Sequence, residues 1–434
     1  MPDYPPDLTI DPLTSPPIAK VRVPGSKSLT NRALIVAALA DGPSTLTGAL
    51  DSDDTRVMID SLQKLAVKVE HDPITATIRI GGGFGRKRQT EADLFIANSG
   101  TSLRFLTAMV ATSRGGIVYR LDGNARMRQR PVADLIQALN GLGSSAKSDL
   151  GTGCPPITVT ADGLDGGFAV VKGDTSSQFL SGLLMALPYA RELTTVEVEG
   201  VLVSQPYVQM TLEVMEAFGV RIGNGKFRRF NVQPAQYAGR KYAIEPDASA
   251  ASYFFAAAAI TGGTITVEGL HSKSIQGDLK FVDILEHMGC QVERGKDSTT
   301  VTGPTSLRGV DVDMNAISDT VMTLGVTAVF AQGLTRIRNV GHIRHKETDR
   351  IVALAAELRK LGATVDEQSD GLIIFPPKHV ASARISTYDD HRMAMSFALA
   401  GLKADGVTIV DPGCVSKTYP GFWDDLAKLR GSEG

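Results

Sequence analysis

Two short stretches of this chain combine cations, hydroxyls and carboxylates in an order typical of anion binding. The first is P-G-S-K-S-L-T-N-R, from Pro24 to Arg32, and the second is H-K-E-T-D-R, from His345 to Arg350. Each lies where a helix is expected to begin, and a helix N-terminus favours phosphate or carboxylate through its unpaired N–H groups and partial positive charge. Because the stretches lie far apart in sequence, they predict a small, multiply charged ligand bound from two sides.

Basic residues recur at expected helix starts, where they are unusual. Ser, Thr, Asn and Asp are the common N-caps, whereas Lys and Arg in the first turn oppose the helix dipole. Departures from local rules tend to mark functional sites. We expect these cations to lie in first helical turns and to need a shared anion, because like charges that converge repel each other. They are Lys27, Arg32, Arg104, Arg126, Arg128, Lys346, Arg350, Arg392 and Lys417.

Composition narrows the class of protein. The 434 residues are 43% hydrophobic and 21% charged, which is typical of a folded chain of two or three domains. A net charge of −2 argues against a nucleic-acid partner, which normally requires a basic excess. Three cysteines far apart favour a reducing compartment. With no signal-peptide pattern and no apolar run long enough to span a membrane, we expect a cytoplasmic protein without a membrane partner.

Internal repeats indicate the fold. An amphipathic helix, a small residue and an alternating strand recur at intervals of about 75 residues, which is typical of a repeat architecture. The small residue is expected to end each helix with positive φ, as glycine does at a C-cap. These small residues are Ala66, Gly143, Gly219, Gly289 and Gly362.

A second class of helix is apolar nearly all round and is therefore expected to be buried. With it, each repeat should contain about two strands and two helices, in six repeats divided three and three. We expect one domain at residues 24–244 and another at residues 1–23 plus 245–434, in which the N-terminal segment pairs with the C-terminal half. The buried helices are expected to begin near Ser28, Thr101, Ser177, Ser249, Thr320 and His391.

Single motifs allow other interpretations. Gly25–Ser28 is similar to the end of a P-loop, although the first glycine of that motif is missing. Gly81–Gly85 could hold a phosphate but is more typical of a turn. His342 and His345 could bind a metal, but without a third nearby ligand a substrate-facing pair is favoured. The H-K-E-T-D-R stretch could be only a ladder of ion pairs, and Tyr388–Arg392 only a capped helix with a core histidine.

Together, the motifs are similar to those of the 5-enolpyruvylshikimate-3-phosphate synthase family (3-phosphoshikimate 1-carboxyvinyltransferases). The likeness runs from Pro24 to Pro420 and includes N-S-G-T-S-x-R, S-S-Q-F, S-D-D-T-R, D-D-H-R-M-A-M and S-K-T-Y-P besides the two stretches above. It implies a two-domain inside-out α/β barrel with three repeats per domain. It further implies that buried helices direct their N-termini at an active site in the interdomain cleft.

The resemblance implies a reaction of the shikimate pathway, which leads to chorismate and the aromatic amino acids. The enolpyruvyl group of phosphoenolpyruvate would add to the 5-hydroxyl of shikimate 3-phosphate, and elimination would release phosphate. The family needs no metal and no organic cofactor, and we expect a monomer that binds only these small anionic substrates. The family's inhibitor glyphosate competes with phosphoenolpyruvate.

The resemblance also assigns site residues. A carboxylate suits removal of the hydroxyl proton, and cations suit stabilisation of the expelled phosphate. The implied acid/base and catalytic residues are Lys27, Asp319, Glu347 and His391. The implied shikimate 3-phosphate site comprises Lys27, Ser28, Arg32, Ser176, Ser177, Gln178, Ser204, Tyr207, Asp319, His342 and Lys346. The implied phosphoenolpyruvate site comprises Lys27, Gly100, Arg126, Gln178, Arg350, Arg392 and Lys417.

Three departures from the family pattern and three rival functions remain. Phe105 replaces a frequent proline and could alter glyphosate sensitivity, His342 replaces a frequent asparagine, and Gln205 replaces a lysine. A UDP-N-acetylglucosamine enolpyruvyl transferase would typically carry a cysteine in the loop at residues 124–131, which has none. An RNA 3′-phosphate cyclase should be more basic. A repeat scaffold without activity would not need the carboxylates of Asp319 and Glu347.

Overall fold

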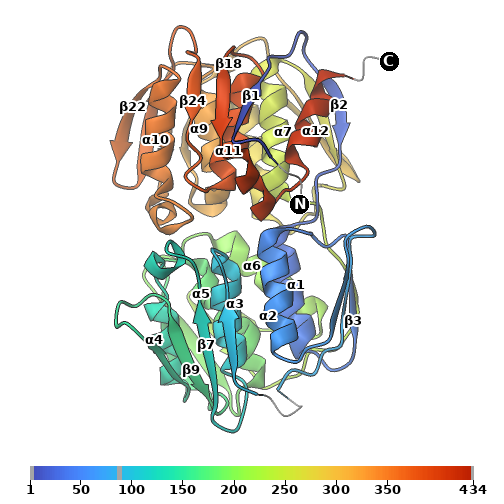
Figure 1. The fold of residues 1–434 in the computed structure, drawn as a ribbon, viewed down its shortest axis with the longest axis vertical. Coiled ribbons are helices and arrows are strands. Elements are labelled where there is room, and N and C mark those ends of the chain that lie inside the picture. The colour runs from blue at the N-terminus through green and yellow to red at the C-terminus, as the bar shows by residue number, and fades with distance from the viewer. Residues whose placement is uncertain (1–3, 86–89, 432–434) are drawn as a thin grey trace. The chain divides into compact units, whose positions relative to one another are not determined.

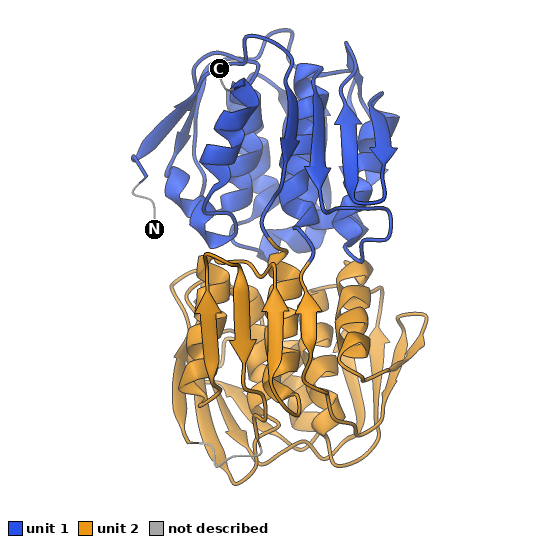
Figure 2. Cartoon of the chain, turned by 90° about the vertical axis from the view of Figure 1, so that its right-hand side faces the viewer, with its two compact units in different colours: residues 1–24, 245–434 blue, residues 25–244 orange. Residues whose placement is uncertain are grey.

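The computed structural model describes residues 4–85 and 90–431, and the chain divides into two compact units (Figure 2). Unit 1 comprises Met1–Pro24 and Glu245–Gly434, and unit 2 comprises Gly25–Ile244. The chain therefore passes between the units twice. None of the helices within the described ranges is both long and apolar enough to cross a membrane.

Unit 2 contains three repeats built on one plan, and several of their elements are labelled in Figure 1. In the second repeat a strand leads into a buried helix, a parallel strand returns, an amphipathic helix follows, and a hairpin completes a sheet of order β6-β7-β9-β8. Its elements are β6 (Ala92–Phe95), α3 (Gly100–Val110), β7 (Ile117–Asp122), α4 (Ala133–Gly141), β8 (Ser145–Ser148) and β9 (Ile157–Ala161).

The first and third repeats of unit 2 follow the same plan. The third has the sheet order β10-β11-β13-β12 and the first has β14-β3-β5-β4. The third contains β10 (Gly167–Lys172), α5 (Ser177–Ala186), β11 (Thr194–Glu199), α6 (Gln205–Ala217), β12 (Gly223–Gly225) and β13 (Arg229–Val232). The first contains α1 (Lys27–Leu39), β3 (Ser44–Thr47), α2 (Asp53–Lys64), β4 (Val69–Asp72), β5 (Thr77–Ile80) and β14 (Lys241–Ala243).

Unit 1 contains the other three repeats. The fourth comprises β2 (Ile18–Val21), α7 (Ala248–Thr261), β15 (Thr264–Glu268), α8 (Phe281–His287), β16 (Gln291–Arg294) and β17 (Ser298–Thr302). The fifth comprises β19 (Asp311–Asp313), α9 (Val321–Ala328), β21 (Thr335–Arg338), α10 (Arg350–Lys360), β22 (Thr364–Gln368) and β23 (Gly371–Phe375). The sixth comprises β24 (Ala383–Ile385), α11 (His391–Gly401), β25 (Val407–Val410), α12 (Phe422–Ala427) and the N-terminal strand β1 (Asp7–Ile10). A short pair, β18 (Leu307–Arg308) and β20 (Ala331–Gln332), accompanies the fifth.

Each passage between the units exchanges a strand. Strand β2 precedes helix α1 in the chain but pairs in parallel with β15 of unit 1, and β14 precedes α7 but pairs in parallel with β3 of unit 2. Strand β1 pairs antiparallel with β25, so the N-terminal segment does pair with the C-terminal half. The passage is tightly packed, because a Cβ on Gly25 would lie 1.9 Å from the carbonyl oxygen of Gly48.

The repeats confirm most of what periodicity indicated. Helices α1, α3, α5, α7, α9 and α11 bury nearly every side chain, as expected of helices apolar all round. The expectation of about two strands per repeat was wrong, because the segment after the amphipathic helix folds into a hairpin in the first five repeats, as in β8 and β9. All five small residues after the amphipathic helices have positive φ, from 59° at Ala66 to 108° at Gly289.

Ala66 stands where the other four repeats have glycine, and this difference makes a prediction. A left-handed backbone costs a residue with a Cβ about 1–2 kcal/mol. Ala66→Gly should therefore raise the free energy of unfolding by about 1 kcal/mol, measured by urea denaturation. Gly219→Ala is the matched control, since its φ is 93° and an added Cβ would meet no atom within 4 Å. It should lower stability, and a lower stability for Ala66→Gly would contradict the strain argument.

Candidate active site

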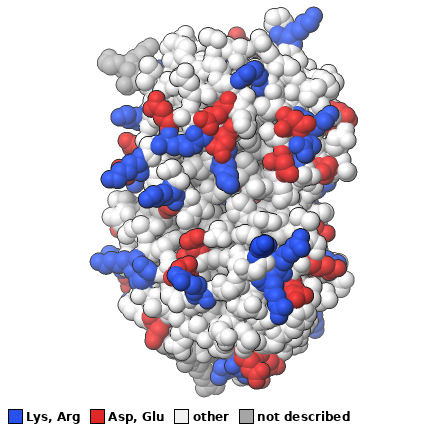
Figure 3. All heavy atoms as spheres, turned by 180° about the vertical axis from the view of Figure 1, so that it is seen from behind, with Lys and Arg blue, Asp and Glu red and all other residues white. Residues whose placement is uncertain are grey.

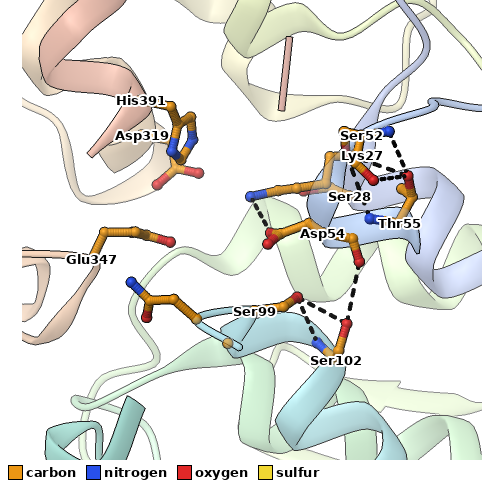
Figure 4. Close-up of polar contacts among 12 residues, drawn as sticks. Lys27, Ser28, Ser52, Asp54, Thr55, Ser99, Ser102, Asp319, Glu347 and His391 are labelled. Atoms are coloured by element: carbon orange, nitrogen blue, oxygen red, sulfur yellow. Dashed lines mark hydrogen bonds and ion pairs between the residues drawn. The ribbon is translucent and has the colours of Figure 1, made fainter. Parts of the chain in front are cut away.

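Lys27 is the first residue of α1 and is buried with a carboxylate beside it. The helix is capped by the Ser26 hydroxyl, which accepts from the Leu29 N–H. Lys27 Nζ lies 3.4 Å from Asp54 Oδ2 (Figure 4). Asp54 lies in the first turn of α2, where Ser52 and Thr55 form a reciprocal capping box. Asp54 was not among the expected site residues, although it belongs to the S-D-D-T-R motif.

Arg32 is enclosed in unit 2 by neutral groups. It donates to the Thr211 hydroxyl at 2.7 Å and to the carbonyl oxygens of Ser28 and Tyr207 at 2.9 and 3.0 Å, and its guanidinium lies 5.2 Å from the centre of the Phe105 ring. Burial lowers the pKa of Arg32 to about 10, and Tyr207 acts in the opposite direction. Since Thr211 and Tyr207 belong to α6, Arg32 fixes the start of α6 against α1. The unusual Phe105 packs on this contact.

Hydroxyl groups mark the starts of α5 and α6, which pack against each other. The Ser176 hydroxyl accepts from the Gln178 N–H at 3.3 Å, and Ser177 is buried. Ser204 occupies the N-cap position of α6 with φ of 54° and is 4% exposed. A non-glycine residue held in this conformation stores strain, which is common at ligand sites. Because each helix follows one of the parallel strands β10 and β11, the two N-termini lie at the same end of the repeat.

Two buried arginines approach the N-terminus of α3. Arg104 donates to the carbonyl oxygen of Gly100 at 3.0 Å, and Arg130 donates to that of Asn98 at 2.9 Å. A Cβ on Gly100 would lie 2.4 Å from a guanidinium nitrogen of each arginine. Only glycine therefore lets both guanidinium groups approach this helix start. Arg130 was not among the expected residues, and its signal was that it is the third arginine of the loop at residues 124–131.

Arg350 forms the centre of an ionic cluster in unit 1. It is 1% exposed and donates to Asp390 Oδ2 at 2.7 Å, to Glu347 Oε2 at 2.8 Å and to Asp319 Oδ1 at 3.3 Å. Burial by itself lowers the pKa of Arg350, but the three carboxylates outweigh it and raise the pKa above its ordinary value. The guanidinium therefore holds both expected acid/base carboxylates, Asp319 and Glu347, in fixed positions.

Asp319 is shared by three cations of unit 1. Arg392 Nη2 donates to Asp319 Oδ2 at 2.7 Å, and Lys346 Nζ lies 3.8 Å from Oδ1, which also faces Arg350. The cluster thus contains three cations and three carboxylates, counting Glu347 and Asp390. The expectation that these cations need a shared anion was wrong for unit 1, because carboxylates already balance their charge. A ligand must compete with these carboxylates.

Two histidines complete the cluster. His391 is fully buried at the start of α11, with Nδ1 3.8 Å from Asp390 Oδ1. Burial lowers the pKa of His342 to about 3, aided by the nearby charge of Lys346, so this imidazole is neutral at physiological pH. Within the described ranges, no three His, Cys, Asp or Glu residues are arranged to hold a metal ion.

The expected helix starts are only partly right. Lys27, Arg350 and Arg392 do lie in first turns, of α1, α10 and α11, whereas Arg32 and Arg104 fall in second turns. Helix α10 begins only at Arg350, because the Asp349 carboxylate accepts from the Ile351 and Val352 N–H groups. Four other cations lie in 3-10 turns or connecting segments, namely Arg126, Arg128, Lys346 and Lys417.

Solved structures of similar fold identify the class of fold to which this protein belongs. The structure is similar to an EPSP synthase from Acinetobacter baumannii, with a TM-score of 0.80, 26% identity and 98% coverage of both chains. It also shares the fold of the enolpyruvyl transferase NikO from Streptomyces tendae, with a TM-score of 0.77, 19% identity and coverage of 98% and 97%. The fold is therefore the two-domain α/β fold of the enolpyruvyl transferases, as the resemblance implied.

The sequence relatives narrow the class further. A profile of EPSP synthase (3-phosphoshikimate 1-carboxyvinyltransferase) matches residues 14–426. The 3-phosphoshikimate 1-carboxyvinyltransferase of Trichormus variabilis is 48% identical over 98% of this chain and 99% of its own length. The chloroplastic enzyme of Arabidopsis thaliana is 46% identical over 94% of this chain and 82% of its own length. The chain belongs to the EPSP synthase family.

The depressed pKa of His342 predicts a pH dependence of stability. The unfolded chain binds a proton here below about pH 6.5, whereas the folded protein does not until about pH 3. This burial therefore costs nothing above pH 6.5 and about 2 kcal/mol of unfolding free energy at pH 5. His342→Asn should lose less stability than the parent between pH 7.5 and pH 5 in urea denaturation. The exposed His287→Asn is the control, and equal slopes for parent and His342→Asn would refute the assignment.

Proposed function

We propose that this protein transfers the enolpyruvyl group of phosphoenolpyruvate to the 5-hydroxyl of shikimate 3-phosphate and releases phosphate. Family membership supports the reaction. The observation that carries the residue roles is the unit 1 cluster, in which Asp319 and Glu347 lie in hydrogen-bond contact with the buried cation Arg350. A scaffold without activity would have no use for acid/base carboxylates held at such a cost in desolvation.

Unit 2 supplies the groups that suit a phosphate ester. In our proposal the hydroxyls of Ser176, Ser177 and Ser204 bind the phosphate of shikimate 3-phosphate, at the starts of α5 and α6, where the helix dipoles favour an anion. Arg32 then positions Tyr207 and the start of α6 through its bonds to that helix. Ser28, Gln178, His342 and Lys346 complete the proposed contacts to this substrate.

Phosphoenolpyruvate is the proposed ligand of the remaining cations. Lys27, Arg126, Arg350, Arg392 and Lys417 would neutralise its phosphate and carboxylate, and the α3 start at Gly100 and the amide of Gln178 would donate hydrogen bonds. Arg392 and Arg350 donate hydrogen bonds to Asp319. When phosphoenolpyruvate binds, Arg350 and Arg392 turn in part from Asp319 towards the anion. One oxygen of Asp319 can then accept a hydrogen bond from the 5-hydroxyl of shikimate 3-phosphate.

Proton transfer follows from this exchange. Asp319 removes the proton from the 5-hydroxyl of shikimate 3-phosphate as the hydroxyl oxygen adds to C2 of phosphoenolpyruvate. Glu347 or Lys27 delivers a proton to C3 of phosphoenolpyruvate and removes a proton from C3 in the elimination step. The phosphate leaves with its charge stabilised by Lys27, which Asp54 orients at 3.4 Å. His391 supports the cluster beside Asp390. This chemistry needs neither a metal nor an organic cofactor.

The rival functions have less support. The loop at residues 124–131 lacks the cysteine expected of a UDP-N-acetylglucosamine enolpyruvyl transferase. For an RNA-processing enzyme, the visible face in Figure 3 carries acidic side chains among the basic ones, whereas a basic surface would be expected. We propose that the enzyme works in the cytoplasm as a monomer. Its three cysteines, which are free thiols, suit a reducing compartment.

A phosphate-release assay tests the reaction. With phosphoenolpyruvate, the protein should release phosphate in the presence of shikimate 3-phosphate and not of UDP-N-acetylglucosamine. Lys27→Met should lower kcat by at least about a hundredfold with an unchanged circular dichroism spectrum. The control Lys428→Met also breaks a lysine–aspartate pair, at 2.6 Å from Asp425, but on the surface, and should keep full activity. Turnover with the sugar nucleotide alone would refute the proposal.

Ser204 separates ligand binding from backbone strain. Ser204→Gly and Ser204→Ala both remove the hydroxyl, so each should raise KM for shikimate 3-phosphate about tenfold. Glycine adopts φ of 54° freely, and the glycine variant should therefore be about 1 kcal/mol more stable than the alanine variant. Unchanged KM values in both variants would remove Ser204 from the substrate site.

A further inference from the structure

Two consecutive residues before α11 have left-handed backbones without being glycine. Tyr388 has φ of 57° and Asp389 has φ of 54°. Such conformations persist only where the surroundings fix them, and they cluster at functional sites. The next residue, Asp390, caps α11 and accepts two bonds from Arg350. The strained turn therefore sets the position of the carboxylate at the centre of the unit 1 cluster.

A carboxylate outside that cluster fixes the strained turn. Glu357 of α10 is fully buried, and its Oε1 accepts from the Tyr388 hydroxyl at 2.7 Å. Its Oε2 accepts from the Ser386 N–H at 3.0 Å and lies 2.7 Å from Lys360 Nζ. Since Ser386 precedes the turn and Tyr388 lies in it, one side chain bonds both and restricts the backbone between them.

Helix α10 thus contacts both ends of the segment Ser386–Asp390, and Lys360 adds a bond to the Ser386 hydroxyl at 3.4 Å. Arg350 and Glu357 are seven residues apart, which places them on one face of the helix. Arg350 bonds Asp390 at the end of the segment, and Glu357 bonds Ser386 near its beginning. The segment continues into α11, where Arg392 donates its N–H to Asp390 at 2.9 Å and its guanidinium to Asp319.

We propose that Glu357 and Tyr388 form a positioning pair that sets the geometry of Asp390 and Arg392 for phosphoenolpyruvate. This inference rests on the proposed function. Neither residue touches the substrate, and both act through the turn at Tyr388–Asp389. Without the carboxylate of Glu357, the turn can relax towards ordinary φ values, and the start of α11 shifts with it. The effect falls on phosphoenolpyruvate, because Arg350 and Arg392 are its proposed ligands.

Two substitutions test the pair by kinetics. Glu357→Gln keeps the shape but turns an NH₂ group towards a donor, and Tyr388→Phe removes one hydrogen bond. Each should lower kcat/KM for phosphoenolpyruvate about tenfold to a hundredfold, as expected for a binding group displaced by about 1 Å. KM for shikimate 3-phosphate should change much less. The matched control is Tyr237→Phe, which removes a buried hydroxyl that donates to the Met185 carbonyl oxygen of unit 2.

Amide hydrogen exchange tests the positioning without turnover. Glu357→Gln should lose protection at the N–H groups of Ser386 and Arg392 while the interior of α7 stays protected. The inference is overturned if both variants lose only thermal stability, as Tyr237→Phe should, and keep the kinetics for phosphoenolpyruvate and the protection of residues 386–392. Failure of the proposed function would appear differently, as no turnover by the parent protein, and the exchange result would still decide whether Glu357 holds the turn.

Discussion

The ionic cluster of unit 1 depends on one buried guanidinium group, that of Arg350. Placing the charge of Arg350 away from water costs several kcal/mol, and only close carboxylates can offset it. Asp390, Glu347 and Asp319 supply them, and they lie in the segments that lead into α11, α10 and α9. Arg350 therefore draws these three segments together, and the same contacts fix the carboxylates proposed for proton transfer. The charge of Arg350 thus accounts both for the packing of these segments and for the position of the acid/base carboxylates.

In unit 2 the buried arginine has neutral partners instead of carboxylates. This residue, Arg32, donates to Thr211 and to backbone carbonyl oxygens, and burial depresses its pKa. The starts of α5 and α6 present serine hydroxyls, and the only carboxylate described at the site in unit 2 is Asp54, which pairs with Lys27. Such a surface suits a ligand that brings its own negative charge, whereas the balanced cluster of unit 1 suits acid/base work. The repeated fold thus carries two kinds of site built at equivalent helix starts.

Sequence periodicity was sufficient for the repeats and for the buried helices, because both follow from local patterns of apolar residues and glycine. It even located Ala66, whose φ of 59° matches that of the glycines. The sequence placed β2 with unit 1 and β14 with unit 2, but it did not identify their partners β15 and β3, because strand pairing is not local. The start of α10 was misplaced, since the capping aspartate is Asp349 and Lys346 precedes the helix.

The side chains that pair with the site cations were the hardest feature to predict from the sequence. The cations stood out as exceptions to helix preferences, but the carboxylates that balance them lie up to 73 residues away, as Asp319 does from Arg392. Glu357 gave no signal, since a glutamate in an amphipathic helix is ordinary. The likeness to a known family supplied Asp319 and Glu347, and only the structure supplied the contacts of Asp54, Arg130 and Glu357.

A double-mutant cycle on Arg350 and Asp390 in the ligand-free protein tests the central claim most directly. The unfolding free energies of Arg350→Met, Asp390→Asn and the double variant give the coupling between the two side chains. A preassembled cluster predicts a favourable coupling of about 1–3 kcal/mol without any substrate. A coupling indistinguishable from zero would contradict the view that this ion pair assembles the site before the substrates arrive.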